Sequence, residues 1–191
     1  MVASVDVTAL FIEGTQDNPD FHEVVEIIRS NTTGNVWLIG GFVFRSIVRA
    51  WYGKEGAKAD FDFLVENPAS TIVFPNSWEK NTNSYGNPKF VRRDGLEVDF
   101  VPLHTVRRQG LPATIESFLK GTPLTVQSIM YNVERQQIEG PIGIRALHDK
   151  IVRVNDLEEA RDYALRKWKA LNAIIKEKAE ALGFMPVFVD L

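Results

Sequence analysis

Apolar positions near the start of the chain predict a helix, a buried strand and a second helix in succession. The first helix, residues 20–29 with Asp20 as its expected N-cap, would bury a stripe at helical spacing: Phe21, Val24, Val25 and Ile28. Residues 36–39 form a continuous apolar run, which is typical of a strand buried on both faces. Gly40-Gly41 ends this run, and a second helical stripe follows at Phe42, Val43, Ser46, Ile47 and Ala50.

The middle of the chain carries strand patterns. Acidic and apolar residues alternate over residues 59–66, so this strand should have one polar and one apolar face. Residues 89–93 and 96–101 flank Asp94-Gly95, a pair that favours the tight turn of a β-hairpin. The intervening residues 68–88 are rich in proline and asparagine and are predicted to be irregular or to carry only short elements.

The second half of the chain is predicted to contain a helix over residues 113–120, a strand over 124–133 and a short helix near 143–150. A long amphipathic helix should then run from Asp156 to Leu182, with apolar residues every three or four positions: Leu157, Ala160, Ala164, Trp168, Leu171 and Ile175. Its balanced charges indicate a solvated outer face. Trp168 and the three other tryptophans are expected in the core.

This order of elements predicts an α+β (mixed α/β) fold, in which helices flank a central mixed sheet and a long helix closes the chain. We expect a head domain over residues 1–155 and a C-terminal helical segment over 156–191 packed on it, as one domain overall. The length of 191 residues agrees with a single core.

Composition narrows the chemistry that the chain can perform. It has no cysteine, which excludes disulfides, thiolate metal sites and a cysteine nucleophile, and its three histidines are widely spaced. The net charge of −3 argues against a broadly basic nucleic-acid-binding surface. Without a basic leader or a long apolar run, the protein is expected to be cytoplasmic with no membrane partner. Because cysteine is absent and the histidines are few and widely spaced, a bound cation should be held by carboxylates.

Three aspartates are candidates for that role. Asp60 and Asp62 alternate with phenylalanine in the predicted strand, so both should project from one face. Adjacent carboxylates repel unless a cation lies between them, and Mg²⁺ or Mn²⁺ suits such oxygen ligands. Asp99, which shares a strand face with Glu97, is the expected third ligand and the base-side carboxylate. The alternative interpretation of Asp60-Phe61-Asp62 is a solvated strand face.

Gly40-Gly41 is the candidate phosphate site. Glycines before a helix let backbone N–H groups approach a triphosphate, and Arg45, one helical turn later, is expected to assist in nucleotide binding. The alternative is a turn that only allows the strand and helix to pack. Arg92-Arg93 and Arg107-Arg108 are weaker phosphate candidates, and Tyr85 and Trp78 are weak candidates for stacking a base.

Residues 36–45 (VWLIGGFVFR) followed by 59–65 (ADFDFLV) resemble the head domain of class II CCA-adding enzymes and bacterial poly(A) polymerases, which belong to the nucleotidyltransferase superfamily with the polymerase-beta-like fold. The resemblance implies that Gly40 and Gly41 hold nucleotide phosphates and that Asp60 and Asp62 bind two magnesium ions. The strand that contains Asp99 occupies the place of a family strand that can furnish another carboxylate.

The chain departs from this family at two places. An expected Val-Arg-Asp is replaced by Val43-Phe44-Arg45, and an Arg-Arg-Asp that contacts nucleotide in the family is replaced by Gly121-Thr122-Pro123. The neck, body and tail domains that grip tRNA in the family have no counterpart in residues 1–191 beyond the last helix. A tRNA-maturing polymerase is therefore not the expected function.

The leading hypothesis is a small metal-dependent nucleotidyltransferase that moves a nucleoside monophosphate from a nucleoside triphosphate to a hydroxyl acceptor by a two-metal mechanism. The acceptor is open among RNA, protein and small molecules, and the oligomeric state is open as well. The alternative is a catalytically inactive protein of the same fold that binds a protein or nucleic acid.

Overall fold

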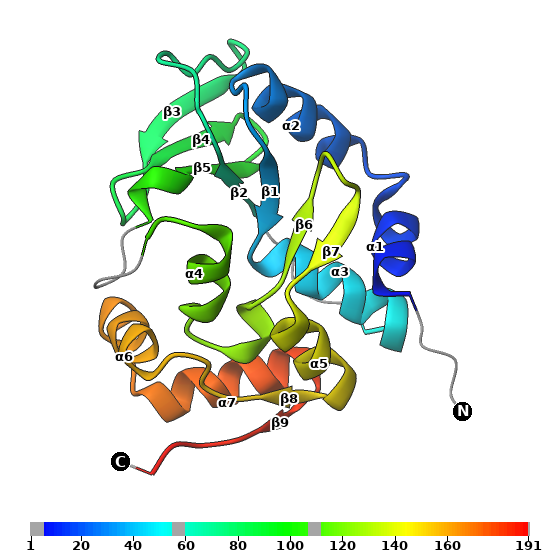
Figure 1. Ribbon diagram of the computed structural model, residues 1–191, viewed down its shortest axis with the longest axis vertical. Coiled ribbons are helices and arrows are strands. Elements are labelled where there is room, and N and C mark those ends of the chain that lie inside the picture. Colours follow the sequence, from blue (N-terminus) through cyan, green and yellow to red (C-terminus); the bar gives the residue numbers. More distant parts are fainter. Residues whose placement is uncertain (1–5, 55–59, 107–111, 191) are drawn as a thin grey trace.

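The computed structural model describes residues 6–54, 60–106 and 112–190. Within them a seven-stranded mixed sheet has the order β3-β4-β5-β2-β1-β6-β7, and helices flank it (Figure 1). The strands are β1 (Val36–Ile39), β2 (Phe61–Val65), β3 (Trp78–Thr82), β4 (Pro88–Arg92), β5 (Glu97–Pro102), β6 (Met130–Asn132) and β7 (Gln137–Glu139). The α-helices are α1 (Val7–Thr15), α2 (Pro19–Ser30), α3 (Gly41–Tyr52), α4 (Ile115–Lys120), α5 (Pro141–Asp149), α6 (Leu157–Arg166) and α7 (Leu171–Leu182). The predicted α+β class is confirmed.

The centre of the sheet follows from its most apolar strands. All four residues of β1 are buried, as expected for a strand covered on both faces. β1 pairs antiparallel with β2 on one side and with β6 on the other. β2 pairs in parallel with β5, so the chain must cross over through the β3–β4 hairpin between them.

Sequence patterns located the elements around the glycine pair. The helices predicted from the stripes that begin at Phe21 and Phe42 are α2 and α3. Asp20 as the cap of α2 is wrong, because the side chain of Asn18 accepts the N–H of Phe21 at 3.0 Å and Pro19 occupies the first helical position. The helix therefore begins one residue before Asp20.

The predicted hairpin is present as β4 and β5, and Gly95 adopts the left-handed region at φ +85° in its turn. The short strand β3 lies within residues 68–88, which were predicted to be irregular or to carry only short elements, although no strand was located there. β3 is an edge strand, and only its first residue, Trp78, is buried. Four exposed polar positions in a row leave no alternation from which a strand is predicted.

The strand predicted over residues 124–133 is mostly wrong. The chain forms a 3-10 turn, η2 (Thr125–Gln127), and only then the short strand β6. Tertiary contacts take up the backbone here: Ser128 O accepts the N–H of Gly143 at 3.0 Å, and Thr125 N donates to Arg153 O at 2.9 Å. These bonds dock the segment on α5 and on the residues after β8 (Ile151–Val152) in place of a sheet neighbour.

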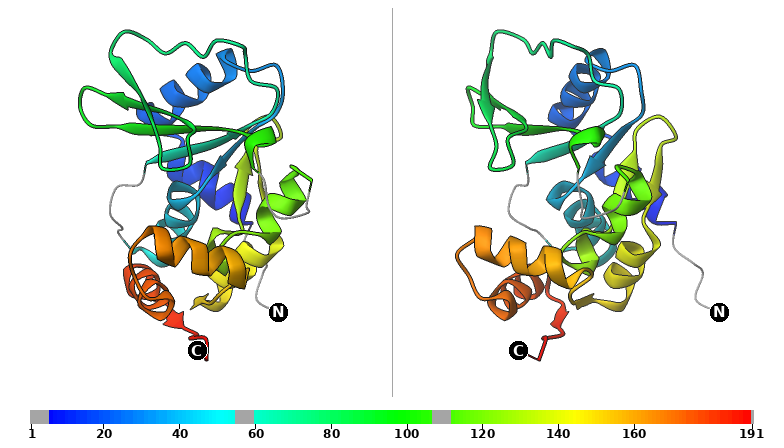
Figure 2. Two further views of the ribbon diagram at one scale, coloured as in Figure 1. Left: turned by 90° about the vertical axis from the view of Figure 1, so that its left-hand side faces the viewer. Right: turned by 60° about the vertical axis from the view of Figure 1, so that its left-hand side comes forward.

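The long C-terminal helix is also wrong, because it is broken into α6 and α7. Trp168 has φ 54°, and Ala170 is extended at φ −66° and ψ 143°, so neither continues a helix. The Trp168 side chain, predicted to lie in the core, is 95% exposed. After the break α7 runs in a different direction and contacts α6, as the left view of Figure 2 shows. Leu171 and Ile175 still reach the core, as expected.

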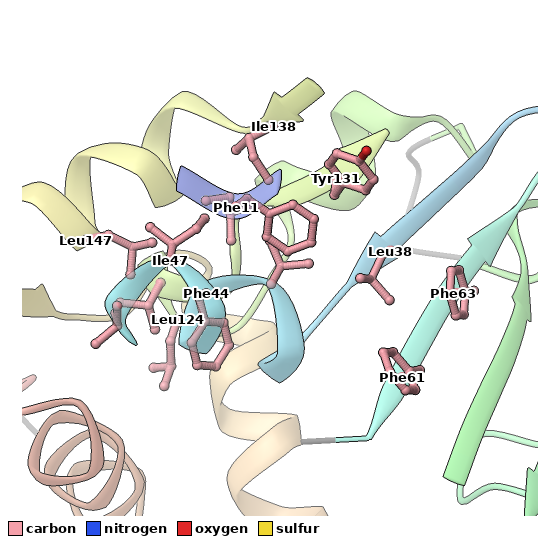
Figure 3. Close-up of a cluster of buried hydrophobic side chains, with 14 of the residues drawn as sticks. Phe11, Leu38, Phe44, Ile47, Phe61, Phe63, Leu124, Tyr131, Ile138 and Leu147 are labelled. Carbon is pink, nitrogen blue, oxygen red and sulfur yellow. The ribbon is translucent and has the colours of Figure 1, made fainter. Parts of the chain in front are cut away.

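One main hydrophobic core joins both halves of the chain. It contains side chains from the strands, from α1 to α3 and from the C-terminal helices. Figure 3 shows Phe61 and Phe63 of β2 projecting beside Leu38 of β1, with Phe44 and Leu124 further along the cluster. In the described part of the chain, no helix combines the length and apolar character that crossing a bilayer would require.

Candidate active site

Two of the predicted aspartates lie side by side on the central strands. Asp62 of β2 and Asp99 of β5 are Cα partners in the parallel register, and both side chains are half-buried. On its other side Asp62 pairs with Ile39, the last residue of β1. The strand pairing therefore places both carboxylates beside the point where β1 leads into α3.

Gly40 forms the junction between β1 and α3 and has φ +76° and ψ −154°, a conformation that glycine adopts readily. A Cβ atom on Gly40 would overlap Asp62 Oδ2. Because glycine has no Cβ, the backbone at the N-terminus of α3 can lie close to the Asp62 carboxylate. The backbone N–H groups at this end of α3 give the site positive character next to the two acids.

The electrostatics of this pair favour a bound proton or cation. Burial first, and then the neighbouring charges of Asp99 and Asp60, raise the pKa of Asp62 to about 7, although the charge of Lys89 acts to lower it. Asp99 Oδ1 is buried and has no hydrogen-bond partner. Lys89, opposite Asp99 on β4, is paired with Glu97. The buried Oδ1 of Asp99 is therefore an acceptor without a donor, and a bound cation would satisfy it.

Two of the three predicted metal ligands are placed where they could bind the same cation, and the third is not. Asp62 and Asp99 are hard oxygen donors on adjacent strands, as Mg²⁺ or Mn²⁺ requires. Asp60 lies one residue before β2 and is exposed, because the pairing of β2 with β5 begins at Phe61. Its predicted place within the strand is therefore wrong. Across residues 6–54, 60–106 and 112–190, no group of three or more histidine and acidic side chains is arranged to hold a metal ion.

A cavity of about 360 Å³ opens beside the pair. Gly40, Asp62 and Asp99 line it from the sheet, and Tyr85 lines it from the turn between β3 and β4. Segment 121–127 contributes Thr122, Pro123 and Gln127. The site thus combines a glycine-flanked helix N-terminus and two carboxylates at the edge of a cavity.

Helix α6 forms a wall of this cavity that the sequence analysis did not identify. Glu159, Tyr163 and Arg166 line it at positions i, i+4 and i+7, which is one helical face. Burial raises the pKa of Tyr163, and Asp62 is among the charges that raise it. The spacing places these three residues on one helical face, but it does not distinguish a face next to a cavity from a solvated one.

Other candidates lie away from the cavity lining. Gly41 and Arg45 lie in α3 and do not line the cavity. Burial, and then the charge of Arg45, lower the pKa of Lys178 in α7. The nucleotide-binding roles of Gly41 and Arg45 stay predictions. Arg92 is held by acids, at 2.6 Å from Asp20 and 2.7 Å from Asp94.

Of the two aromatic candidates for stacking a base, one is buried and the other borders the cavity. Trp78 is 8% exposed and packs on Phe74, so it has no open face for a base, whereas Tyr85 borders the cavity. Arg107 and Arg108 lie outside the described residues.

Comparison with known proteins gives the fold an independent context. No family model and no curated protein matches the sequence. Among solved structures, a CCA-adding enzyme in complex with CTP superposes with a TM-score of 0.58 at 18% identity, over 84% of this chain and 39% of that one. The Thermotoga maritima CCA-adding enzyme complexed with tRNA gives 0.55 at 17% identity, over 91% and 46%. The Bacillus stearothermophilus CCA-adding enzyme in complex with CTP gives 0.54 at 21% identity, over 83% and 40%.

The chain spans less than half the length of each of these proteins. At these identities the likeness concerns the fold, and it agrees with the resemblance inferred from residues 36–45 and 59–65. The protein shares the fold of the matched parts of these CCA-adding enzymes, which is the nucleotidyltransferase-like fold that the sequence resemblance predicts.

Proposed function

We propose that this protein is a metal-dependent nucleotidyltransferase. It would transfer a nucleoside monophosphate from a nucleoside triphosphate to an acceptor hydroxyl. The acceptor oxygen forms a bond to the α-phosphorus, the bond to the bridging oxygen breaks, pyrophosphate leaves, and the hydroxyl proton passes to a base. The chemistry of such a step is mainly positioning and charge stabilisation, which the cavity residues are suited to provide.

One observation carries this proposal: the parallel pairing of Asp62 with Asp99 directly beside Gly40 at the start of α3. It joins two oxygen donors to a backbone that can approach phosphate closely. Solved structures of the same fold contain CTP, which supports a nucleoside triphosphate as the ligand of this cavity.

Each residue has a definable part. Asp62 and Asp99 would hold a divalent cation, with Asp60 as an additional ligand, and such a cation lowers the pKa of a bound hydroxyl and offsets phosphate charge. Asp99 would accept the acceptor proton. Gly40 and Gly41 would present backbone N–H groups to the phosphates, with Arg45 assisting.

The test is a transfer assay with each labelled nucleoside triphosphate, Mg²⁺ or Mn²⁺, and RNA, protein and small-molecule acceptors, accompanied by measurements of nucleotide binding. We expect Asp62→Asn and Asp99→Asn to lower the transfer rate by orders of magnitude. Asp17→Asn is the matched control, because Asp17 is exposed and is not one of the residues that line the cavity. Absence of both transfer and metal-dependent nucleotide binding would refute the enzymatic function.

A non-catalytic binding module is the second candidate. Two observations favour it: the uncharged segment Gly121-Thr122-Pro123 beside the cavity, and the lack of a third metal ligand arranged among the described residues. A binding module would keep its partner affinity in Asp60→Asn and Asp62→Asn variants, whereas a metal-dependent enzyme would lose its rate.

A further inference from the structure

The cavity is short of positive charge for a triphosphate ligand. Among the described residues that line it, Asp62, Asp99 and Glu159 are acidic, and Arg166 is the one basic side chain. Lys89, opposite Asp99 on the neighbouring strand, is already paired with Glu97, and Arg92, outside the lining, is paired with three acids. A divalent cation at Asp62 and Asp99 would offset those two carboxylates, and the remaining phosphate charge would still need a donor.

Arg166 is placed and held in a way that suits this need. It is the last residue of α6, and its side chain is 36% exposed. The guanidinium lies 4.8 Å from the centroid of the ring of Tyr85, which belongs to the turn between β3 and β4. Its ion pair with Asp162 is long, at 3.8 Å, and follows the surface of the helix, where such pairs contribute little. Its side chain makes no hydrogen bond to another described residue.

We propose that Arg166 binds the phosphates of the nucleoside triphosphate, so that α6 supplies the cation that segment 121–123 does not. This inference rests on the proposed nucleotidyltransferase function. The planar guanidinium can donate parallel hydrogen bonds to two phosphate oxygens. Without ligand, its cation–π contact with the Tyr85 ring holds it beside the cavity. On binding, Arg166 exchanges weak contacts for charge-assisted hydrogen bonds.

The test is calorimetric titration of the full chain with ATP, CTP, GTP and UTP in the presence of Mg²⁺, and with the matching nucleosides. For the triphosphate that binds most tightly, we expect Arg166→Gln to weaken binding by about 10- to 100-fold, the usual effect of removing hydrogen bonds to a charged group. Arg166→Lys should lose less, because the charge remains but the planar fork does not. Nucleoside affinity should not change.

Arg161→Gln is the matched control. Arg161 lies on the same helix, is exposed and does not line the cavity, so its loss changes the net charge equally. Thermal unfolding of every variant verifies that the fold is retained. Unchanged triphosphate affinity in Arg166→Gln would overturn this inference and leave the proposed function standing. An equal loss for the nucleoside would refute the phosphate assignment, and a wild-type chain that binds no triphosphate would refute both proposals.

Discussion

Gly40 is the residue at which backbone conformation and chemistry depend on each other most directly. Its φ of +76° is unfavourable for an L side chain, and the space for a Cβ is filled by the Asp62 carboxylate. Gly95 has a similar φ of +85°, but a Cβ there would meet nothing within 4 Å. A substitution at Gly95 therefore introduces backbone strain alone, whereas a substitution at Gly40 introduces backbone strain and a clash with the Asp62 carboxylate.

We expect Gly40→Ala to destabilise the protein by about 2–4 kcal/mol and to abolish metal-dependent nucleotide binding, because Asp62 must move. Gly95→Ala should cost only the strain, about 1–2 kcal/mol, and keep that binding. Urea unfolding and nucleotide titration measure both. Equal losses of binding in the two variants would show that strain alone, and no displacement of Asp62, is responsible.

The pKa of Asp62 makes a second prediction at this scale. In the metal-free protein this pKa is raised to about 7, whereas an unfolded chain has an aspartate pKa near 3.9. Between these values the unfolded state releases a proton that the native state keeps, so stability falls as the pH rises from about 4 to about 7.

Asp62→Asn removes this penalty. With a chelator present, the variant should be about 1–3 kcal/mol more stable than wild type near pH 8, and the gain should vanish below about pH 4. Urea unfolding at the two pH values measures the difference, and Asp17→Asn serves as the control without the effect. A gain that does not depend on pH would contradict this account.

At the scale of elements, the break between α6 and α7 is the clearest case of local conformation that opposes residue type. Trp168 carries a left-handed φ of 54° and has a 95% exposed side chain, so it adds strain without packing. Glycine suits that conformation far better.

Trp168→Gly should therefore stabilise the protein by about 0.5–1 kcal/mol, despite the loss of a large apolar side chain. The same substitution one turn earlier, Leu165→Gly, should destabilise it by a similar amount, because Leu165 is exposed but helical. Thermal unfolding compares them. A loss of stability in Trp168→Gly would mean that the indole packs on a partner.

The sequence predicted elements whose apolar pattern comes from burial in the main core, such as β1, β2 and α3. It failed where tertiary contacts decide the backbone. β3 is a polar edge strand, residues 124–129 are held by α5 and Arg153, and the α6–α7 break occurs within an unbroken helical pattern.

The candidate site divides in the same way. Asp62 and Asp99 could be predicted because strand alternation fixes their faces, although their pairing depends on a parallel register that periodicity does not encode. Glu159, Tyr163 and Arg166 could not be assigned, since a charged helix face next to solvent and one next to a cavity have the same sequence pattern.

At the scale of the whole molecule, the C-terminal helices belong to the same core as the sheet. Ala160 of α6 and Ile175 of α7 are fully buried in the main cluster with Phe44 of α3. Lys178 of α7 lies 5.4 Å from the centroid of the Phe44 ring. Helices α6 and α7 therefore cover part of the main hydrophobic core, and α6 also lines the cavity.

A chain that ends at residue 155 should consequently lose cooperative unfolding, because its core would be open to water. A chain that ends at Val189 is the control, and it should unfold as the full chain does, since it keeps the hydrogen bonds between Asn172 and Val189. Circular dichroism during thermal unfolding distinguishes the two. Cooperative unfolding of the shorter chain would show that residues 1–155 fold independently.

The parallel pairing of β2 with β5 also bears on how the protein folds. Asp62 and Asp99 become neighbours only after the chain between them has closed a long loop around the β3–β4 hairpin, which makes this contact costly to form early. In a refolding experiment, the hairpin can form from local contacts, whereas the carboxylate pair must await the global step. Affinity for a divalent cation should therefore appear with the slowest folding phase. When folding and unfolding rates are measured with and without the cation, it should lower the unfolding rate more than it raises the folding rate.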